Sequence, residues 1–283
     1  MDSDAYHKTG LSTLPDENDH TYWVEFEKQP FEYGGLRNAF KGIMHGEGPK
    51  DGQMCVVKAP IQQYAKLFDS WVPDLAASKM ANKFAEKFNT ECVPLLLNDM
   101  LIVDNENERE MKIEFLLPLV AQVDYVDQND ESYIRLGSYV IIEPFLEGIY
   151  HKFNSNAGYE DDIKGVLLTF THWTHAISDH SLMICDLQGV ETPQGYVLTD
   201  PAVHSSEWIY GVTDLGVEGM EEVLKFHTCT NHCRALGLPN PQNCHYVQDA
   251  RQQVHNTKYV FHLTEEQKLR VMMSTNQLFS KIT

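Results

Sequence analysis

The sequence lacks a long hydrophobic run, an excess of basic residues and a dense set of cysteines. Its longest apolar runs, such as residues 116–120, fall far short of the ~18 residues that a membrane-spanning helix needs. The chain has 283 residues, of which 22 are Lys or Arg and 41 are Asp or Glu, so its formal net charge is −19. Nucleic-acid binding requires a basic surface, so this charge argues against a nucleic-acid partner and favours a basic protein or peptide.

Cysteine content and the N-terminal residues both argue against a secreted protein. Six cysteines are few for this length, and the first residues have neither the basic segment nor the apolar segment of a signal peptide. We therefore expect a cytoplasmic protein with no membrane span, in which the cysteines are reduced or bound to a metal ion.

Hydrophobic patterning predicts an α+β fold. Apolar residues at helical spacing predict helices over 74–89 and 163–177, whereas alternation and short apolar runs predict strands around them. A strand over 182–188 and a second strand over 196–199 flank a predicted turn. The chain divides into a flexible acidic leader, a strand-rich lobe, a second lobe of mixed structure and a C-terminal extension with an amphipathic helix: residues 1–20, 21–143, 144–240 and 241–283.

A short segment rich in cysteine and histidine indicates a metal site. His227, Cys229 and Cys233 are side chains that zinc prefers, and the two cysteines would share a face if they lay on one helix. Structural zinc sites have four protein ligands, and the spacing alone leaves the fourth open among His172, His175, His180, His204, His232 and Cys244. The alternative is two buried cysteines beside a surface histidine.

Polar residues around the predicted turn indicate phosphate and magnesium chemistry. Asp186 and Gln188 lie on one face of the predicted strand, and the turn brings Asp200 back towards them. Such an oxygen-rich cluster suits Mg²⁺. Upstream, a Gly-Gly turn with Arg37 and a strand that ends in Lys58 supply cations for phosphates, so the chain carries the parts that phosphoryl transfer needs. The usual protein-kinase signatures H-R-D, D-F-G and A-P-E are absent from the sequence.

The order of these segments resembles the alpha-kinases, a family of atypical Ser/Thr protein kinases. The resemblance covers most of the chain, from about residue 22 to 240. It is carried by the segments GLRNAF (35–40), VVK (56–58), IEPFLEG (142–148), KFNSN (152–156), CDLQGV (185–190), LTDP (198–201), DLGVEG (214–219) and the histidine–cysteine segment 227–233.

The resemblance implies a two-lobed, kinase-like fold with a structural zinc in the second lobe. It implies that the zinc ligands are His172, His227, Cys229 and Cys233, and that Gln188 and Asp200 hold Mg²⁺. It also implies roles at the nucleotide and the acceptor, so that the expected residues are Lys58 and Arg37 at the ATP phosphates, Glu143 and Phe145 at the adenine through their backbone, and Asp186 as the catalytic carboxylate. Residues 211–219 would lie beside the peptide substrate.

Two features depart from the family pattern. Residues 192–195 lengthen the turn between the two acidic positions, and Asp214 stands where the family often has Asn, which predicts additional negative charge near the active site. The expected activity is transfer of phosphate from Mg-ATP to Thr or Ser of a protein substrate, with basic residues near the target. The alternatives are a catalytically silent scaffold of the same fold that binds a protein partner, and a zinc hydrolase.

Overall fold

The computed structural model describes residues 9–16, 18–61, 71–98, 111–126, 134, 136–160 and 165–241. The chain forms two compact units, each made of two separate stretches of sequence. The first unit contains residues 1–71 and 117–145, and the second contains residues 72–116 and 146–283. Helices and strands are mixed, so the predicted α+β class is confirmed. No helix among the described residues is long and apolar enough to span a membrane.

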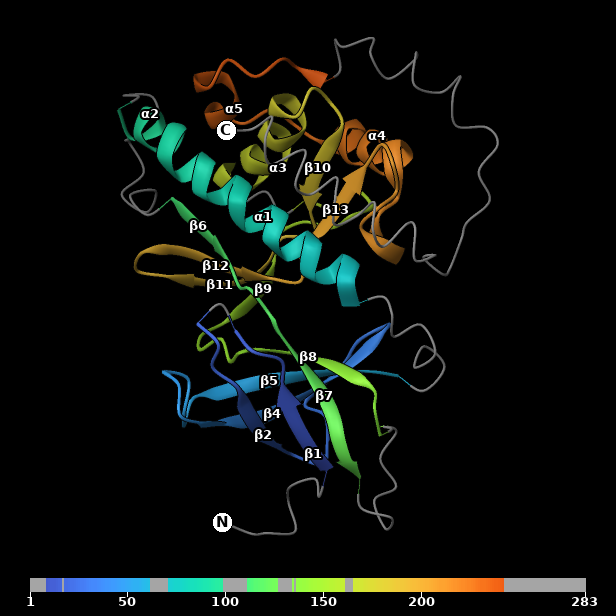
Figure 1. The fold of residues 1–283 in the computed structure, drawn as a ribbon. Helices are drawn as coiled ribbons and strands as arrows, with labels where there is room; N and C mark the ends of the chain where they lie inside the picture. The colour runs from blue at the N-terminus through green and yellow to red at the C-terminus, as the bar shows by residue number, and fades with distance from the viewer. Residues whose placement is uncertain are drawn as a thin grey trace. The chain divides into compact units, whose positions relative to one another are not determined.

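An antiparallel sheet of seven strands makes up the first unit (Figure 1). Its order is β2-β1-β7-β8-β5-β4-β3, and β2 also pairs with β4, so six strands close into a barrel and β3 extends it. Strands β2 and β4 alternate buried and less buried residues, as expected where one face of a strand lines a barrel interior. The strands are β1 (Thr9–Thr13), β2 (Tyr22–Phe26), β3 (Glu32–Tyr33), β4 (Arg37–Gly46), β5 (Met54–Pro60), β7 (Leu119–Val126) and β8 (Tyr139–Pro144).

The predicted leader is wrong where the structure describes it. Thr9–Thr13 forms β1, which pairs with β7 over five residues and with β2. Leu11 explains the difference because its side chain is buried in the barrel core, and a single apolar residue among polar neighbours gives little signal in a sequence. Residues 1–8 lie outside the described residues.

The second unit contains a four-stranded sheet, a two-stranded sheet and the main helices. The larger sheet has the order β6-β12-β11-β9, and the smaller pairs β10 with β13. The strands are β6 (Lys112–Phe115), β9 (Tyr150–Lys152), β10 (Leu182–Cys185), β11 (Gln188–Thr192), β12 (Gly195–Thr199) and β13 (Ala202–Ser205). The helices are α1 (Trp71–Glu91), α2 (Val93–Asn98), α3 (Gly165–Ile177), the 3-10 turn η2 (Gly211–Thr213), α4 (Gly216–Phe226) and α5 (Asn231–Ala235).

Helices α1 and α3 confirm the two helices expected from the hydrophobic pattern. Phe84 and Phe88 of α1 pack against Phe170 and Trp173 of α3, and ring centroids lie 5.2–6.0 Å apart. These aromatic residues belong to the largest cluster of buried apolar residues in the second unit. Because α1 packs here, its residues belong to the second unit from Val72 onward, whereas the predicted boundary kept all of 21–143 together.

The predicted strand over 182–188 is broken in the structure. Strand β10 ends at Cys185 and β11 begins at Gln188, so the hairpin of β11 and β12 starts only after Asp186 and Leu187. Asp186 has a φ of 58°, which a regular strand does not allow. The predicted C-terminal extension, apart from its first residue, lies outside the described residues.

Candidate active site and metal centre

A buried ion pair connects two strands of the first unit. Lys58 of β5 places its Nζ 2.6 Å from Oε2 of Glu143 in β8, and the two residues are 9% and 3% exposed. The strands pair so that Lys58 lies opposite Ile141 and Glu143 opposite Val56. The sequence predicts a role for each residue but not this contact, because the two are 85 positions apart and no local pattern links them.

The Gly-Gly turn and Arg37 lie beside Lys58 in the same sheet. Gly34 donates its backbone N–H to the carbonyl of Arg37 at 2.9 Å, which closes the turn between β3 and β4. Strand β4 then pairs with β5, so that Ala39 lies opposite Lys58 and Arg37 opposite Pro60. Because side chains alternate along strands, Arg37 and Lys58 share one face of the sheet.

Phe145 directly follows β8 and forms, with Phe31, an aromatic pair that contacts Lys41. Its backbone N–H donates to the carbonyl of Met54 at 3.0 Å, and its ring centroid lies 6.2 Å from that of Phe31. Lys41 Nζ lies 5.5 and 5.6 Å from the two ring centroids, which is the range of a cation–π contact. This first unit therefore brings together Arg37, Lys58, Glu143 and Phe145 within one set of adjacent strands.

In the second unit, Asp186 and Asp200 lie where the chain passes between the two sheets. Asp186 separates β10 from β11, and Asp200 separates β12 from β13. Gln188 pairs with Thr199, and its Nε2 donates to the backbone carbonyl of Asp200 at 3.4 Å. The structure therefore confirms that the hairpin returns Asp200 to the neighbourhood of Gln188, even though the hairpin begins later than predicted.

Lys152 is a site residue that the sequence argument missed. It lies in β9 opposite Gln188, and its Nζ is 2.6 Å from Oδ1 of Asp186. Its side chain is 47% exposed, whereas that of Asp186 is 17% exposed. The available signal was that Lys152 opens the segment KFNSN (152–156), which is one of the segments that carry the resemblance. Lys152 keeps a cation beside the carboxylate of Asp186.

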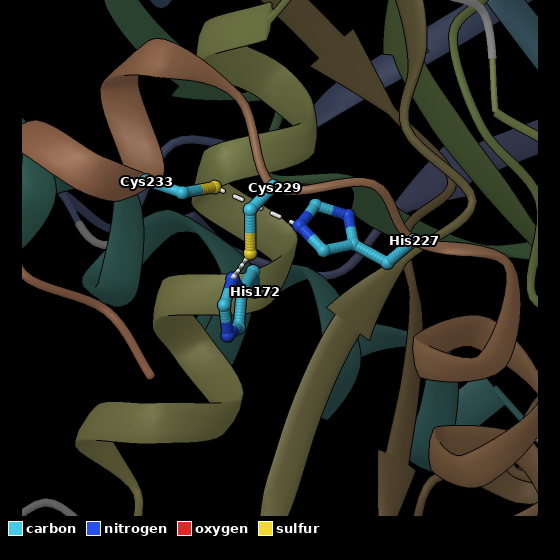
Figure 2. Close-up of side chains that lie close together, drawn as sticks. All are labelled: His172, His227, Cys229 and Cys233. Atoms are coloured by element: carbon cyan, nitrogen blue, oxygen red, sulfur yellow. Dashed lines mark hydrogen bonds between the residues drawn. The ribbon is translucent and has the colours of Figure 1, made fainter. Parts of the chain in front are cut away.

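Four side chains come together at the predicted metal site (Figure 2). His172, His227, Cys229 and Cys233 each offer one ligand atom, and these atoms all lie within 4.8 Å of one another. Cys229 Sγ lies 3.9 Å from Nδ1 of His172, and Cys233 Sγ lies 3.6 Å from Nε2 of His227. Spacing left the fourth ligand open, and the structure brings in His172, as the resemblance implies.

Separate elements position the four side chains of the cluster. His172 is on α3, His227 caps the end of α4, and only Cys233 lies on α5. Cys229 precedes α5 because Thr230 is the N-cap of that helix and accepts the backbone N–H of Cys233 at 3.1 Å. The two cysteines therefore do not lie on one helix, and the condition for a shared helix face is not met.

Hydrogen bonds around the cluster favour a thiolate. Burial raises the pKa of Cys233, but hydrogen bonds with His172, His227 and two threonine hydroxyls outweigh it and lower the pKa to about 4. Burial lowers the pKa of His227, but bonds to Cys233 and Glu160 outweigh it and raise the pKa to about 9. Glu160 Oε1 lies 2.8 Å from Nδ1 of His227. Two thiols, two imidazoles and a carboxylate behind one imidazole form a donor set that fits zinc.

The competing histidines have other neighbours. Nδ1 of His175 lies 3.3 Å from Nδ1 of His180. His204 contacts the carbonyl of Asn156 through Nε2 at 2.9 Å and accepts the backbone N–H of Leu215 through Nδ1 at 3.0 Å. His232 is not in the cluster, and Cys244 lies outside the described residues.

Asp214 does not present its charge at the surface. It is 4% exposed, and its carboxylate accepts four hydrogen bonds at 2.6–3.1 Å: the backbone N–H groups of Ser205, Tyr210 and Gly216 and the hydroxyl of Ser205. Burial raises the pKa of this carboxyl group, and the hydrogen bonds lower it. These bonds give Asp214 a structural role in residues 205–216, and the expectation of added negative charge near the active site stays a prediction.

The alpha-kinase family model matches residues 32–233, which is most of the chain. The chain belongs to the alpha-kinase family. Among curated members, it is 31% identical over 228 residues to alpha-protein kinase vwkA of Dictyostelium discoideum, covering 79% of this chain and 33% of that protein. It is 26% identical over 255 residues to human eukaryotic elongation factor 2 kinase, covering 86% of this chain and 31% of that protein. The chain thus spans about a third of these relatives.

Solved alpha-kinase domains share the fold. The alpha-kinase domain of myosin heavy chain kinase A in complex with ADP has a TM-score of 0.65 and 21% identity, and the match covers 82% of this chain and 97% of that chain. The same domain in complex with AMP-PNP also has a TM-score of 0.65. At this level of identity the likeness describes the fold of this alpha-kinase chain.

Proposed function

We propose that this chain is a protein kinase domain that transfers the γ-phosphoryl group of Mg-ATP to Thr or Ser of a protein. Family membership supports the class of reaction. The observation that carries the proposal is the cluster of Asp186, Lys152 and Gln188 with Asp200 at one junction between two sheets. The relatives' printed names describe kinases, and solved members of the fold have been crystallised with ADP and AMP-PNP. The two compact units would be the two lobes of the kinase.

The first unit would bind the nucleotide. Lys58 would contact the phosphates, and the ion pair with Glu143 supports this role because it holds the ammonium group at a defined place on β5. Arg37 would assist from the same face of the sheet. Glu143 and Phe145 would meet the adenine through their backbone, since Glu143 lies near the end of β8 and Phe145 directly follows that strand.

The second unit would carry out the transfer. The acceptor oxygen would form a bond to the γ-phosphorus while the bond from that phosphorus to the ADP oxygen breaks. Asp186 would orient the acceptor hydroxyl and receive its proton. Lys152 supports this role, because its ammonium group lies 2.6 Å from the carboxylate and fixes the orientation of that carboxylate. Gln188 and Asp200 would hold Mg²⁺, which supplies positive charge to the phosphates when bound.

The histidine–cysteine cluster would hold a structural zinc ion. Four protein side chains and no water position are typical of structural sites, whereas a catalytic zinc keeps one position open. This argues against the zinc-hydrolase alternative. Glu160 would fix the ring of His227 and so orient the ligand. Ligands from α3, the end of α4 and α5 would be tied together by the ion.

The physiological substrate would be a protein with basic residues near the target Thr or Ser, because the chain carries a net charge of −19. The proposal includes a cytoplasmic location, because six cysteines are few for a chain of this length. A transfer assay with radiolabelled ATP and basic Thr-containing peptides tests the proposal. Incorporation that requires Mg²⁺, and that Asp186→Asn abolishes, supports it. Nucleotide binding without incorporation would instead support the silent scaffold.

A further inference from the structure

We propose that Asn154 is a positioning residue that holds the bend carrying Asp186. The proposal rests on the proposed function, in which Asp186 is the catalytic carboxylate. Asn154 itself has no contact with the side chain of Asp186 among the described interactions, so its effect would be transmitted through the backbone of Leu187.

The bend is fixed by hydrogen bonds to the residue that follows Asp186. Leu187 donates its backbone N–H to Oδ1 of Asn154 at 2.7 Å, and its carbonyl accepts the backbone N–H of Phe153 at 2.8 Å. Both backbone groups of Leu187 are therefore bonded to one short segment. Asp186 precedes this anchored residue and adopts a φ of 58°. A shift of Leu187 would move the carboxylate directly.

The side chain of Asn154 is held from its other end as well. Its Nδ2 donates to the hydroxyl of Thr171 in α3 at 2.9 Å, and the residue is completely buried. Its backbone also forms an isolated β-bridge with Glu160. These contacts fix the orientation of the amide, because a flipped amide would place its NH2 group against the N–H of Leu187. Hydrogen bonds thus connect the segment that contains Lys152 to the bend that contains Asp186.

This arrangement predicts a defect in the chemical step with little change in nucleotide binding. Displacing a reacting group by about 1 Å costs on the order of 100-fold in rate. We expect Asn154→Ala to lower kcat about tenfold or more while the KM for ATP changes less than about threefold. Asn154→Asp retains an acceptor for the N–H of Leu187, and the hydroxyl of Thr171 can donate to its second oxygen, so this variant should keep kcat within about threefold of the wild type.

Asn89 provides a matched control in the same unit. Its amide makes the same kind of contact at the opposite edge of the four-stranded sheet, donating to the carbonyl of Ile113 at 2.7 Å and accepting its N–H at 2.9 Å. Asn89→Ala should lower the melting temperature without lowering kcat of the folded protein. Equal kcat losses in Asn154→Ala and Asn89→Ala would overturn the proposal, and so would an Asn154→Asp variant as slow as Asn154→Ala.

Further measurements distinguish a failure of the positioning role of Asn154 from a failure of the proposed kinase function. If Asn154→Ala does not fold, Thr171→Val tests the same anchor, because it removes the partner of Nδ2. A kcat that is lowered about threefold in Thr171→Val while that of Asn154→Asp stays close to wild type supports the role. A kcat that is lower in Asn154→Asp than in Thr171→Val overturns it. A wild-type chain without transfer activity would contradict the proposed function alone. A crystal structure of Asn154→Ala would then decide the anchoring role, since Asp186 should be displaced.

Discussion

Asp186 and Asp200 lie at the same junction, on two antiparallel chain segments that both pass there from one sheet into another. On one side of this point Cys185 pairs with Ala202, and on the other side Gln188 pairs with Thr199. Both aspartates adopt left-handed conformations, with φ of 58° and 48°. Among residues other than Gly, Asp and Asn tolerate this conformation best, so the backbone and the proposed chemistry favour the same residue type.

Substitution of Asp186 should separate backbone strain from activity. Asp186→Asn keeps a residue that tolerates the left-handed conformation, so we expect loss of phosphate transfer with a nearly unchanged free energy of unfolding. Asp186→Ala should lose transfer equally and also lower the free energy of unfolding by about 1 kcal/mol. Radiolabel incorporation and urea unfolding measure the two effects. An Asp186→Asn variant with normal transfer would remove Asp186 from the chemistry.

The ion pair between Lys58 and Glu143 should couple stability to nucleotide binding. Removing one partner leaves a buried charge, so Lys58→Met and Glu143→Gln should each lower the free energy of unfolding by about 3 kcal/mol. The double variant should lose clearly less than the sum. Chemical unfolding of all three proteins measures the coupling. As a control, Lys87→Met breaks a partly exposed pair with Glu91 on α1 and should cost less than about 0.5 kcal/mol.

An additive result for the Lys58 and Glu143 variants would show that the ion pair contributes no stability. Nucleotide affinity gives an independent readout. Lys58→Met should weaken ATP binding because it removes the cation, whereas Glu143→Gln should weaken it because the ammonium group loses its fixed position.

Patterns that depend on near neighbours in the chain were predictable. Met80, Phe84 and Phe88 recur every four residues, and this spacing predicts a helix whose buried face the structure confirms. The return of Asp200 towards Gln188 follows from a short turn, and the turn is where it was expected. Such features require only the periodicity of helices and strands and the geometry of turns.

Features that depend on contacts across the chain were not predictable from spacing. Glu143 reaches Lys58 only because β5 and β8 become neighbours in the barrel, and β1 joins that barrel through one buried leucine, Leu11. The break at Asp186 follows from the bonds of Leu187 to Asn154, 33 positions earlier in the chain. His172 was selected by the resemblance to the alpha-kinases and not by its distance along the chain from Cys229.

Removal of the carboxylate behind His227 should weaken metal binding. Glu160→Gln leaves the four proposed ligands in place but removes the acceptor charge 2.8 Å from Nδ1 of His227, so we expect zinc affinity to fall roughly 10- to 100-fold. Metal analysis of the wild type should find one zinc ion per chain, and competition with a chelator measures the affinity. Chelation should also lower the melting temperature of the wild type. A melting temperature that is unchanged by chelation would contradict the structural role.

Buried His175 should make stability fall at mildly acid pH. Burial lowers the pKa of His175 to about 3, and the neighbouring His180 and His172 add to the effect. In the unfolded chain the pKa is near 6.5, so between about pH 6.5 and 3 the unfolded state binds a proton that the folded state does not. Stability from this group is therefore complete above about pH 6.5 and declines as the pH falls. At pH 5 the loss is about 2 kcal/mol.

His175→Gln isolates this contribution. Urea unfolding at pH 7.5 and pH 5.0 gives the drop in stability within each protein, so any packing defect and any effect of the metal cluster that the proteins share cancel in the comparison. The drop in the wild type should exceed that in His175→Gln by about 2 kcal/mol. The exposed His151 provides a control, because His151→Gln should retain the wild-type drop. If His175→Gln and the wild type lose the same stability on acidification, the buried imidazole is not what makes this protein sensitive to acid.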